Sequence, residues 1–464
     1  MKQGDSSNYY FEDAPIGRAI MHMSLPMMLG MCLNVIYNII DAFFIGKLNQ
    51  TPMMSAIALA LPFSTILMAI GNLFGTGGGT YISRLLGEKN LKEAQRVSAV
   101  TFYFSLISGL LLIILCTPFL PSLLQLLGAK GDTLLPTRNF ILVSLLGSPV
   151  VVANFALGQI VRAEGASKES MYGMAVSVLV NIMLDPILIF TCHMGVMGAA
   201  LATVLGNFGA VIYYVFYLQK KSMTLTVAAE SFKPNWRMTG EIFKIGVSAM
   251  IMDLFLIVST LLLNNFSAAY GDYAVAAFGI SQRVVQLSDF IGMGLFMGIV
   301  PLVAYSYTAR DIRRMMGIIK TTTAYITVLV AAVSATLLLF RIQVIKLFTA
   351  DPQVIKVGIV ILAAMLISSL FTSYSGLFTG IFQGIGREKE AAIMSMAQGV
   401  FLIPIMIMGN IWFGLDGVIW SMAVAEVLAS LIGLGLWIHF RKNSALKDFL
   451  RQPEQPPFCT DWMD

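Results

Sequence analysis

The sequence predicts an all-α membrane protein of about twelve transmembrane helices, arranged as two parallel six-helix repeats. Three observations predict this fold class. Of the 464 residues, 57% are hydrophobic and only 12% are charged, and the mean hydropathy is +0.79. Long apolar stretches recur along the whole chain, and motifs of the first half return in the second. A soluble domain carries about 25% charged residues, so much of this chain must face lipid.

The apolar stretches are long enough to cross a bilayer, which takes roughly 20 helical residues. Residues 1–17 include Glu12 and Asp13 and lack an apolar core, so we expect no cleavable signal peptide and a first span that directs insertion. Some stretches exceed the minimum and must tilt or protrude. The predicted spans lie near 18–45, 53–78, 97–118, 134–160, 170–192, 195–219, 240–265, 272–305, 317–340, 356–383, 390–412 and 416–440.

Basic residues divide unevenly between the two sides of the predicted membrane. Most of the 30 fall in the even-numbered loops or the termini, which places both termini in the cytoplasm of a prokaryotic cell and makes the protein a multi-pass inner-membrane (plasma-membrane) protein. The net charge of +5 forms no single patch, so no nucleic-acid partner is expected. The four cysteines show no metal-ligand spacing. The basic residues predicted on the non-cytoplasmic side of the membrane are Lys47, Lys130, Arg138, Arg341, Lys346 and Lys356.

A weak internal repeat divides the chain into halves at an offset of roughly 220 residues. The stretch GQIVRAEGASKE at 158–169 resembles GIFQGIGREKE at 380–390, and two further pairs, one before and one after these stretches, keep the same order. Six helices separate the copies, so both halves insert with the same orientation and a cavity is expected between them. The predicted parts are a cytoplasmic N-terminus 1–17, a bundle 18–219, a cytoplasmic linker 220–239, a second bundle 240–440 and a cytoplasmic tail 441–464.

Acidic residues inside the spans are the first candidates for function. A carboxylate at mid-bilayer costs at least ~2.5–3.5 kcal/mol on insertion scales, so each one needs a reason. On the first span, Asn34, Tyr37 (or Asn38) and Asp41 are spaced by three, four and seven residues and share one helix face. This stripe predicts a polar site in the first half.

A second stripe lies on the fifth span. Asp185 follows Asn181 by four residues, and Ser177 lies one turn earlier. Pro186 comes next and lacks an amide proton, so it frees a carbonyl one turn back. Carboxylates and freed carbonyls are hard oxygen ligands suited to Na⁺ or to relaying a proton. The second half lacks both acids at the corresponding positions, so the pair belongs to the first bundle.

The acids of the second half have fewer companions in sequence. Asp289 shares a face with Gln286 and has Arg283 close by, which fits a structural ion pair or hydrogen-bond knot as well as a substrate contact. Asp253 and Glu426 have no such companions. Arg283 is the one basic residue expected to be clearly buried within the spans.

Polar motifs in the first half resemble those of the multidrug and toxic compound extrusion (MATE) family, closest to its DinF-like and related prokaryotic members. The resemblance covers essentially the whole chain. Its motifs are Pro26…Asn34-x2-Tyr37-x3-Asp41 followed by Phe43-Phe44-Ile45-Gly46, Gly87-Glu88-Lys89, and Gly158…Arg162-Ala-Glu-Gly165 leading into Asn181-x3-Asp185-Pro186.

The resemblance implies a V-shaped pair of bundles and a monomer that exports cationic or amphipathic organic molecules in exchange for H⁺ or Na⁺, with no other cofactor. The family's cation site in the first bundle maps onto Asp41, Asn181, Asp185 and Thr203, which could bind Na⁺. Tyr37 and Asn154 would line the same bundle. The tenth span lacks the acid used by the NorM-like branch, which favours a mechanism in the first bundle.

Two alternatives remain open from the sequence. A lipid-linked oligosaccharide flippase of the same wider superfamily would need several embedded arginines or lysines to hold a pyrophosphate. An intramembrane enzyme would need a catalytic constellation. The histidines His22, His193 and His439 lie far apart near span ends, so no enzyme activity is expected.

Overall fold

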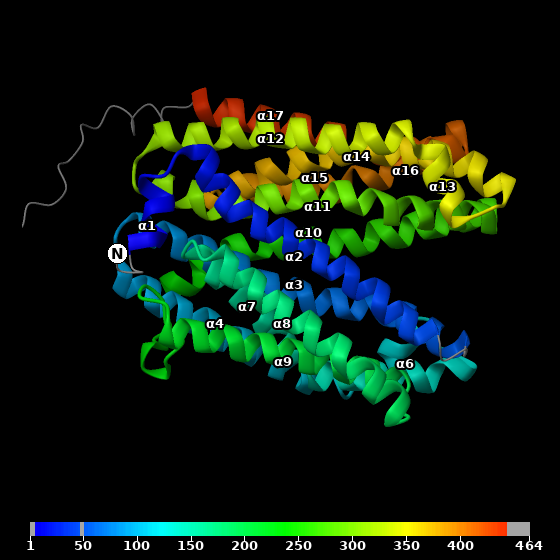
Figure 1. Cartoon of the computed structure of the whole chain (residues 1–464), viewed down its shortest axis with the longest axis horizontal. Coiled ribbons are helices and arrows are strands. Elements are labelled where there is room, and N and C mark those ends of the chain that lie inside the picture. Colours follow the sequence, from blue (N-terminus) through cyan, green and yellow to red (C-terminus); the bar gives the residue numbers. More distant parts are fainter. Residues whose placement is uncertain (1–4, 47–50, 443–464) are drawn as a thin grey trace, which may run out of the picture.

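The chain is almost entirely helical in the computed structural model, which describes residues 5–46 and 51–442 (Figure 1). The tail from residue 443, with Cys459, lies outside the described residues, as do the side chains of Asn38, Phe43 and Ile45. Every long apolar stretch of the sequence forms a helix or a bent pair of helices, because a backbone in lipid must satisfy its own hydrogen bonds.

The first half of the chain forms one bundle after a short N-terminal helix. Its helices are α1 (Asp5–Glu12), α2 (Ile16–Gly46), α3 (Thr51–Gly87), α4 (Leu91–Cys116), α5 (Leu120–Leu126), η1 (Gly131–Thr133), α6 (Leu134–Leu146), α7 (Ser148–Ala163), α8 (Ser167–Pro186), the π-helical turn η2 (Ile187–Thr191) and α9 (Val196–Lys220).

The second half forms a matching bundle after a connecting segment. Its elements are η3 (Ala229–Ser231), α10 (Trp236–Tyr270), α11 (Asp272–Thr308), α12 (Ile312–Leu339), α13 (Arg341–Phe348), α14 (Pro352–Gly384), α15 (Glu388–Val400), α16 (Leu402–Phe413) and α17 (Leu415–Lys442).

The number of spans agrees with the sequence. Among the described residues, eleven helical segments are long and apolar enough to cross a membrane, and a bent pair makes a twelfth if it is one span. That pair is Gly131–Leu146 and Ser148–Ala163, bent by 57°. Pro149 follows the bend and cannot donate a backbone hydrogen bond, which explains the break at this position.

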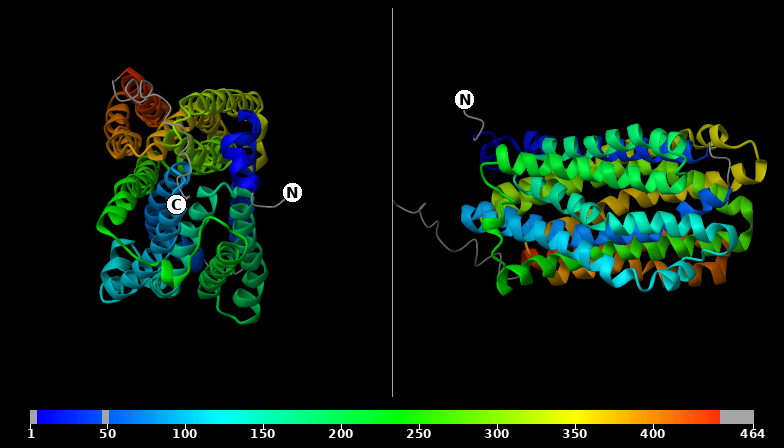
Figure 2. Two further views of the ribbon diagram at one scale, coloured as in Figure 1. Left: turned by 90° about the vertical axis from the view of Figure 1, so that its left-hand side faces the viewer. Right: turned by 90° about the horizontal axis from the view of Figure 1, so that it is seen from below.

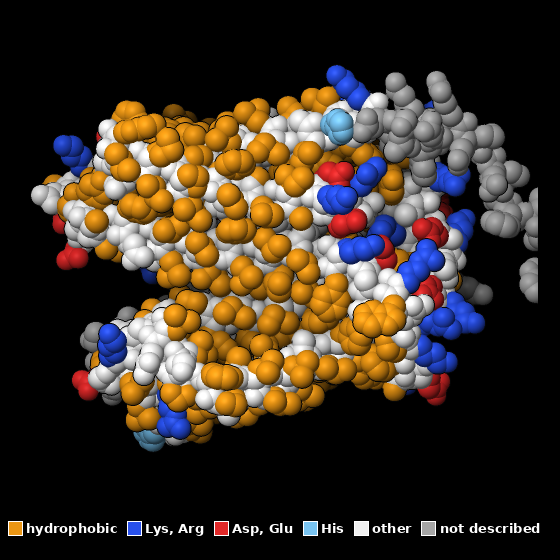
Figure 3. Space-filling view, turned by 180° about the vertical axis from the view of Figure 1, so that it is seen from behind, with side chains coloured by type: hydrophobic (Ala, Val, Ile, Leu, Met, Phe, Trp, Pro, Cys, Tyr) orange, Lys and Arg blue, Asp and Glu red, His pale blue; other side chains and the backbone are white. Residues whose placement is uncertain are grey.

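The two bundles meet along one end of the molecule and separate toward the other (Figures 1 and 2). Helices α2 and α3 of the first bundle pack against α10, α11 and α12 of the second. We call the end that carries α1 the α1 end and the opposite end the open end. Figure 3 shows a groove bordered by hydrophobic side chains that enters between the bundles from the open end, while charged side chains gather toward the α1 end.

Glycines allow the backbones of the two bundles to touch. A Cβ atom on Gly77 of α3 would lie 2.0 Å from the carbonyl oxygen of Ile242 on α10, and one on Gly246 would lie 2.0 Å from the carbonyl oxygen of Leu73. Neither carbonyl can move aside without breaking its helix. The α3–α10 crossing, which we call the glycine seam, therefore requires residues without side chains.

Polar contacts between the bundles close the α1 end. Arg84 of α3 forms an ion pair of 3.4 Å with Glu241 of α10. The Thr308 hydroxyl on α11 donates a hydrogen bond of 2.8 Å to the carbonyl oxygen of Arg84. These contacts hold the α1 end shut in the conformation described.

Helix α1 docks across both bundles, which the sequence did not predict. Phe11 is 2% exposed, stacks on Tyr305 of α11 with ring centroids 4.7 Å apart, and lies against Gly165 in the turn between α7 and α8. Arg314 of α12 donates a hydrogen bond of 3.0 Å to the carbonyl oxygen of Tyr10. The first helix thus contacts residues from both halves of the chain.

Candidate functional site

Three helices of the first bundle bring the two polar stripes together. Helix α2 packs against α8, and α8 packs against α9. Asp185 is fully buried on α8, Asn181 is 2% exposed, and Asp41 on α2 is partly buried. Asp41 lies close enough to Asp185 for their charges to interact. The acids predicted from two separate spans therefore share one site.

The hydroxyl of Thr203 on α9 joins the three helices. It donates a hydrogen bond of 3.0 Å to the carbonyl oxygen of Ala199 and accepts one of 3.3 Å from the amide of Asn181. The Tyr37 hydroxyl on α2 lies 3.2 Å away. A hydroxyl has a single proton, which Thr203 gives to Ala199, so Tyr37 must be the donor here.

Several oxygen atoms of this site have no hydrogen-bond partner among the described residues. Both carboxyl oxygens of Asp185 and the amide oxygen of Asn181 are buried in this state. Buried polar atoms are normally paired, and an unpaired carboxylate is costly. Carboxylate and amide oxygens fit Na⁺, and the same carboxylate could instead take a proton, so the donor set suits either ion.

The backbone next to Asp185 is irregular. Helix α8 ends at Pro186, which cannot donate to the carbonyl of Ile182 one turn back. A π-helical turn follows, in which Cys192 donates a hydrogen bond of 2.8 Å to the carbonyl oxygen of Ile187. Single π-helical turns are frequent at functional sites. The freed carbonyl expected from the sequence thus lies within one turn of the buried acid.

Asn154 on α7 extends the site through a residue that sequence reasoning missed. Its amide donates a hydrogen bond of 2.5 Å to Asn207 on α9, whose own amide donates one of 2.7 Å to the carbonyl oxygen of Thr203. The spacing of four between Thr203 and Asn207 was the available signal. Asn34 is half-buried on α2 and takes no part in these hydrogen bonds.

The second bundle holds a separate polar cluster. The Ser369 hydroxyl donates a hydrogen bond of 2.5 Å to Asp289. Glu426 lies beside Ser375 and Thr372 and close enough to Asp289 for their charges to interact. Glu426 therefore has companions from other helices that its own sequence neighbourhood does not show.

The prediction that Arg283 is buried is wrong. Arg283 and Gln286 are exposed, whereas Val284, Val285 and Ser288 on the adjoining face of α11 are buried. The packed face of α11 takes the apolar and small residues, and the arginine points away from it. Among the described residues, the arginine or lysine that is buried is instead Arg162, which the sequence placed in a loop after a span ending at 160. It lies in the last turn of α7 and is 7% exposed.

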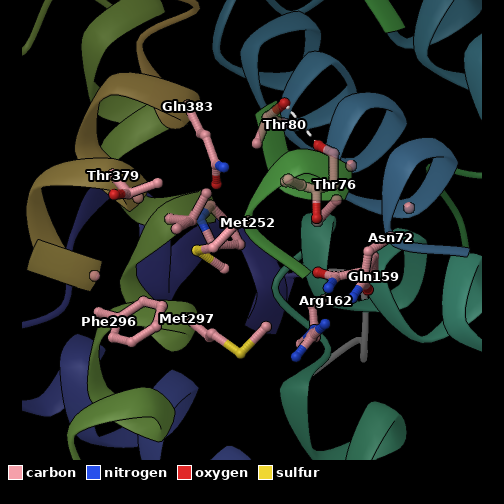
Figure 4. Close-up of a pocket in the computed structure, with 18 of the residues that line it drawn as sticks. Asn72, Thr76, Thr80, Gln159, Arg162, Met252, Phe296, Met297, Thr379 and Gln383 are labelled. Atoms are coloured by element: carbon pink, nitrogen blue, oxygen red, sulfur yellow. Dashed lines mark hydrogen bonds between the residues drawn. The ribbon is translucent and has the colours of Figure 1, made fainter. Parts of the chain in front are cut away.

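A cavity lies between the bundles, where the internal repeat predicts one, but the sequence does not show which residues line it. It lies toward the α1 side of the groove and is open to solvent, and its empty space, the open part included, is about 740 Å³. Figure 4 shows its walls, with Met252, Phe296, Met297, Thr379 and Gln383 from the second bundle facing Asn72, Thr76, Thr80, Gln159 and Arg162 from the first.

Asp253 lies in the wall of this cavity and accepts a hydrogen bond from the opposite bundle. It is 8% exposed, and Asn72 on α3 donates a hydrogen bond of 2.9 Å to its carboxylate. Met252, Met293, Met297 and Phe296 also line the cavity, and such side chains can adapt to varied apolar ligands.

Comparison with known proteins decides the family. The MatE family pattern matches residues 26–187 and 248–408, once in each half, at the offset of the internal repeat. The chain belongs to the MATE family. Two curated relatives of this MATE protein are the multidrug export protein MepA of Staphylococcus haemolyticus (strain JCSC1435) and that of Staphylococcus aureus (strain NCTC 8325 / PS 47). Each is 42% identical over 430 residues, covering 93% of this chain and 95% of the relative.

Solved MATE structures share the whole fold. One is described as the outward-facing conformation of a multidrug resistance MATE family transporter of the MOP superfamily, and another as MATE in complex with MaL6. Both superpose with a TM-score of 0.89 at 25% identity, covering 96% of this chain and 99% of theirs. The twelve-span, two-bundle fold predicted from the sequence is confirmed, as is the family resemblance.

Proposed function

We propose that this MATE protein is a secondary active multidrug exporter that expels cationic or amphipathic organic molecules in exchange for H⁺ or Na⁺. The observation that carries the proposal is the pairing of the buried Asp185 with the partly buried Asp41, in a site with three oxygen atoms that have no hydrogen-bond partner among the described residues. The names of the MepA relatives support multidrug export, and the three methionines and the phenylalanine that line the cavity suit varied apolar ligands.

The mechanism follows alternating access. The α1 end carries most of the basic residues and would face the cytoplasm, so the described conformation would open outward. H⁺ or Na⁺ entering from outside would bind at Asp41 and Asp185 and cancel their charge. Loss of that charge would alter the packing of α2 against α8 and release a cationic substrate. Coupling arises because the same carboxylates cannot hold both ligands favourably.

Transport in liposomes tests this function. The purified protein is reconstituted, and ethidium uptake is followed under a pH gradient or a Na⁺ gradient imposed separately. We expect one gradient to drive uptake in the wild type and in the control Asp272→Asn, which changes an exposed acid at the start of α11. Asp41→Asn and Asp185→Asn should abolish it.

Two other outcomes of this experiment would contradict parts of the proposed function. Gradient-driven uptake that survives in both variants would remove the coupling role from the first bundle. Absence of uptake for several cations under either gradient would contradict multidrug export and leave the flippase alternative to be tested with a lipid-linked pyrophosphate.

A further inference from the structure

Arg162 is a buried cation in the wall of the central cavity. It occupies the last turn of α7, is 7% exposed, and is drawn among the lining side chains in Figure 4. Its Nη1 atom lies 3.3 Å from the sulfur of Met27 on α2, a weak acceptor. A guanidinium carries five N–H donors in a planar fork, so this contact uses little of its capacity.

No carboxylate of the described residues neutralises Arg162. The nearest acid in sequence is Glu164, but that side chain accepts hydrogen bonds of 2.6 Å from Ser222 and from Thr224. The acid in the cavity wall, Asp253, is bonded to Asn72 and forms no ion pair with the arginine. A buried charge without a partner is expensive, so a cation kept here calls for an anion that arrives from outside the chain.

The cavity around Arg162 suits a ligand that carries a carboxylate on an apolar, aromatic body. Gln159 supplies a further amide on the same helix, and Met297 and Phe296 face it from the second bundle. An arginine fork recognises a carboxylate through two parallel hydrogen bonds, which a simple ammonium group does not match.

We propose that Arg162 is a specificity-determining residue that binds the carboxylate of zwitterionic amphipathic substrates in the central cavity. This proposal rests on the export function above and names the residue that would distinguish a substrate with a carboxylate from a pure cation. Asp253, on the second bundle, would face the positive end of the same molecule, so that the two charges of the cavity match the two charges of the ligand.

Two rhodamine dyes test the proposal. Rhodamine 110 carries a free carboxylate, and rhodamine 123 is its methyl ester, so the pair differs at this group alone. Binding of each dye to the purified full-length protein is measured by fluorescence polarisation. The variants are Arg162→Met, which removes the charge, Arg162→Lys, which keeps it, and Arg96→Met, which changes an arginine outside the cavity.

We expect Arg162→Met to weaken binding of rhodamine 110 by roughly tenfold or more and to leave rhodamine 123 within about twofold of the wild type. Arg162→Lys should fall between the two, and Arg96→Met should match the wild type. Retained binding of the ester shows that each variant is folded.

Equal effects of Arg162→Met on both dyes, or no effect on either, would overturn the carboxylate subsite while leaving export of cations intact. Failure of the wild type to bind either dye would count against the proposed export function as well as the subsite.

Discussion

Asn72 on α3 donates a hydrogen bond of 2.9 Å to Asp253 on α10, so an amide of the first bundle satisfies a carboxylate buried in the second. The bond crosses the boundary along which the bundles must move relative to one another. It therefore contributes both to the stability of the described conformation and to the choice between conformations.

Substitution Asn72→Leu should destabilise the protein by about 1–3 kcal/mol, because it leaves the carboxylate of Asp253 buried without its partner. The measurement is the melting temperature in detergent, followed by intrinsic fluorescence. The double variant Asn72→Leu, Asp253→Leu should recover much of the loss, since both polar groups are then removed. A single variant as stable as the wild type would show that the bond contributes nothing net.

Adding one methyl group to the glycine seam should open the α1 end. Gly246→Ala places a Cβ against the carbonyl oxygen of Leu73, whereas Gly279→Ala on α11 meets nothing within 4 Å. A membrane-impermeant maleimide should label Ser83→Cys, introduced after replacement of the native cysteines, several times faster in the Gly246→Ala background. The Gly279→Ala background should label at the original rate. Equal rates in both would refute the seam as the closing contact.

Thr203→Val keeps the side-chain shape at the junction of three helices but removes the acceptor of Asn181 and Tyr37. An unsatisfied buried group costs about 1–3 kcal/mol, so gradient-driven ethidium uptake should fall roughly tenfold. Thr336→Val is the matched control, because that exposed hydroxyl bonds only to the carbonyl oxygen of Ala332. Unchanged initial rates in Thr203→Val would exclude a role for this junction in coupling.

Stability should depend on pH through Glu164, which lies between α7 and α8. Burial raises the pKa of this carboxyl, and the hydroxyls of Ser222 and Thr224 oppose the rise. The Glu164 carboxyl therefore holds its proton more tightly in the folded protein than in the unfolded chain. The stability from this group is complete below the ordinary pKa of about 4.5 and declines as pH rises through the raised folded pKa.

Melting temperatures at several pH values check this expectation. The wild type should lose stability across the pH range above 4.5 more steeply than Glu164→Gln, which cannot ionise. Glu230→Gln, an exposed change in the same connecting region, should follow the wild type. Identical slopes in all three proteins would mean that Glu164 does not titrate in this range.

The fold could be predicted because each span is marked by its own long run of apolar residues. The stripe of Asn34, Tyr37 and Asp41 was equally accessible, since residues on one helix share a face by spacing alone. Contacts between different helices could not be predicted in this way. Asn72 and Asp253 belong to different bundles, and nothing in either neighbourhood points to the other.

The predicted burial of Arg162 and Arg283 was wrong for a related reason. The apolar stretch before Arg162 ends at 160, but the helix continues to Ala163 and its last turn packs inside the bundle. Burial of a charged residue depends on which face of a helix its neighbours cover. For Arg283 that face is open, and only the assembled bundle determines this.

The docking of α1 has a consequence for how the protein is made. Phe11 and Tyr10 leave the ribosome first, yet the groups that bind them, Tyr305 and Arg314, follow some 300 residues later. The N-terminal helix therefore cannot complete its contacts until α11 and α12 of the second bundle have been made. A chain whose second bundle failed to insert would leave the Phe11 ring without its stacking partner Tyr305.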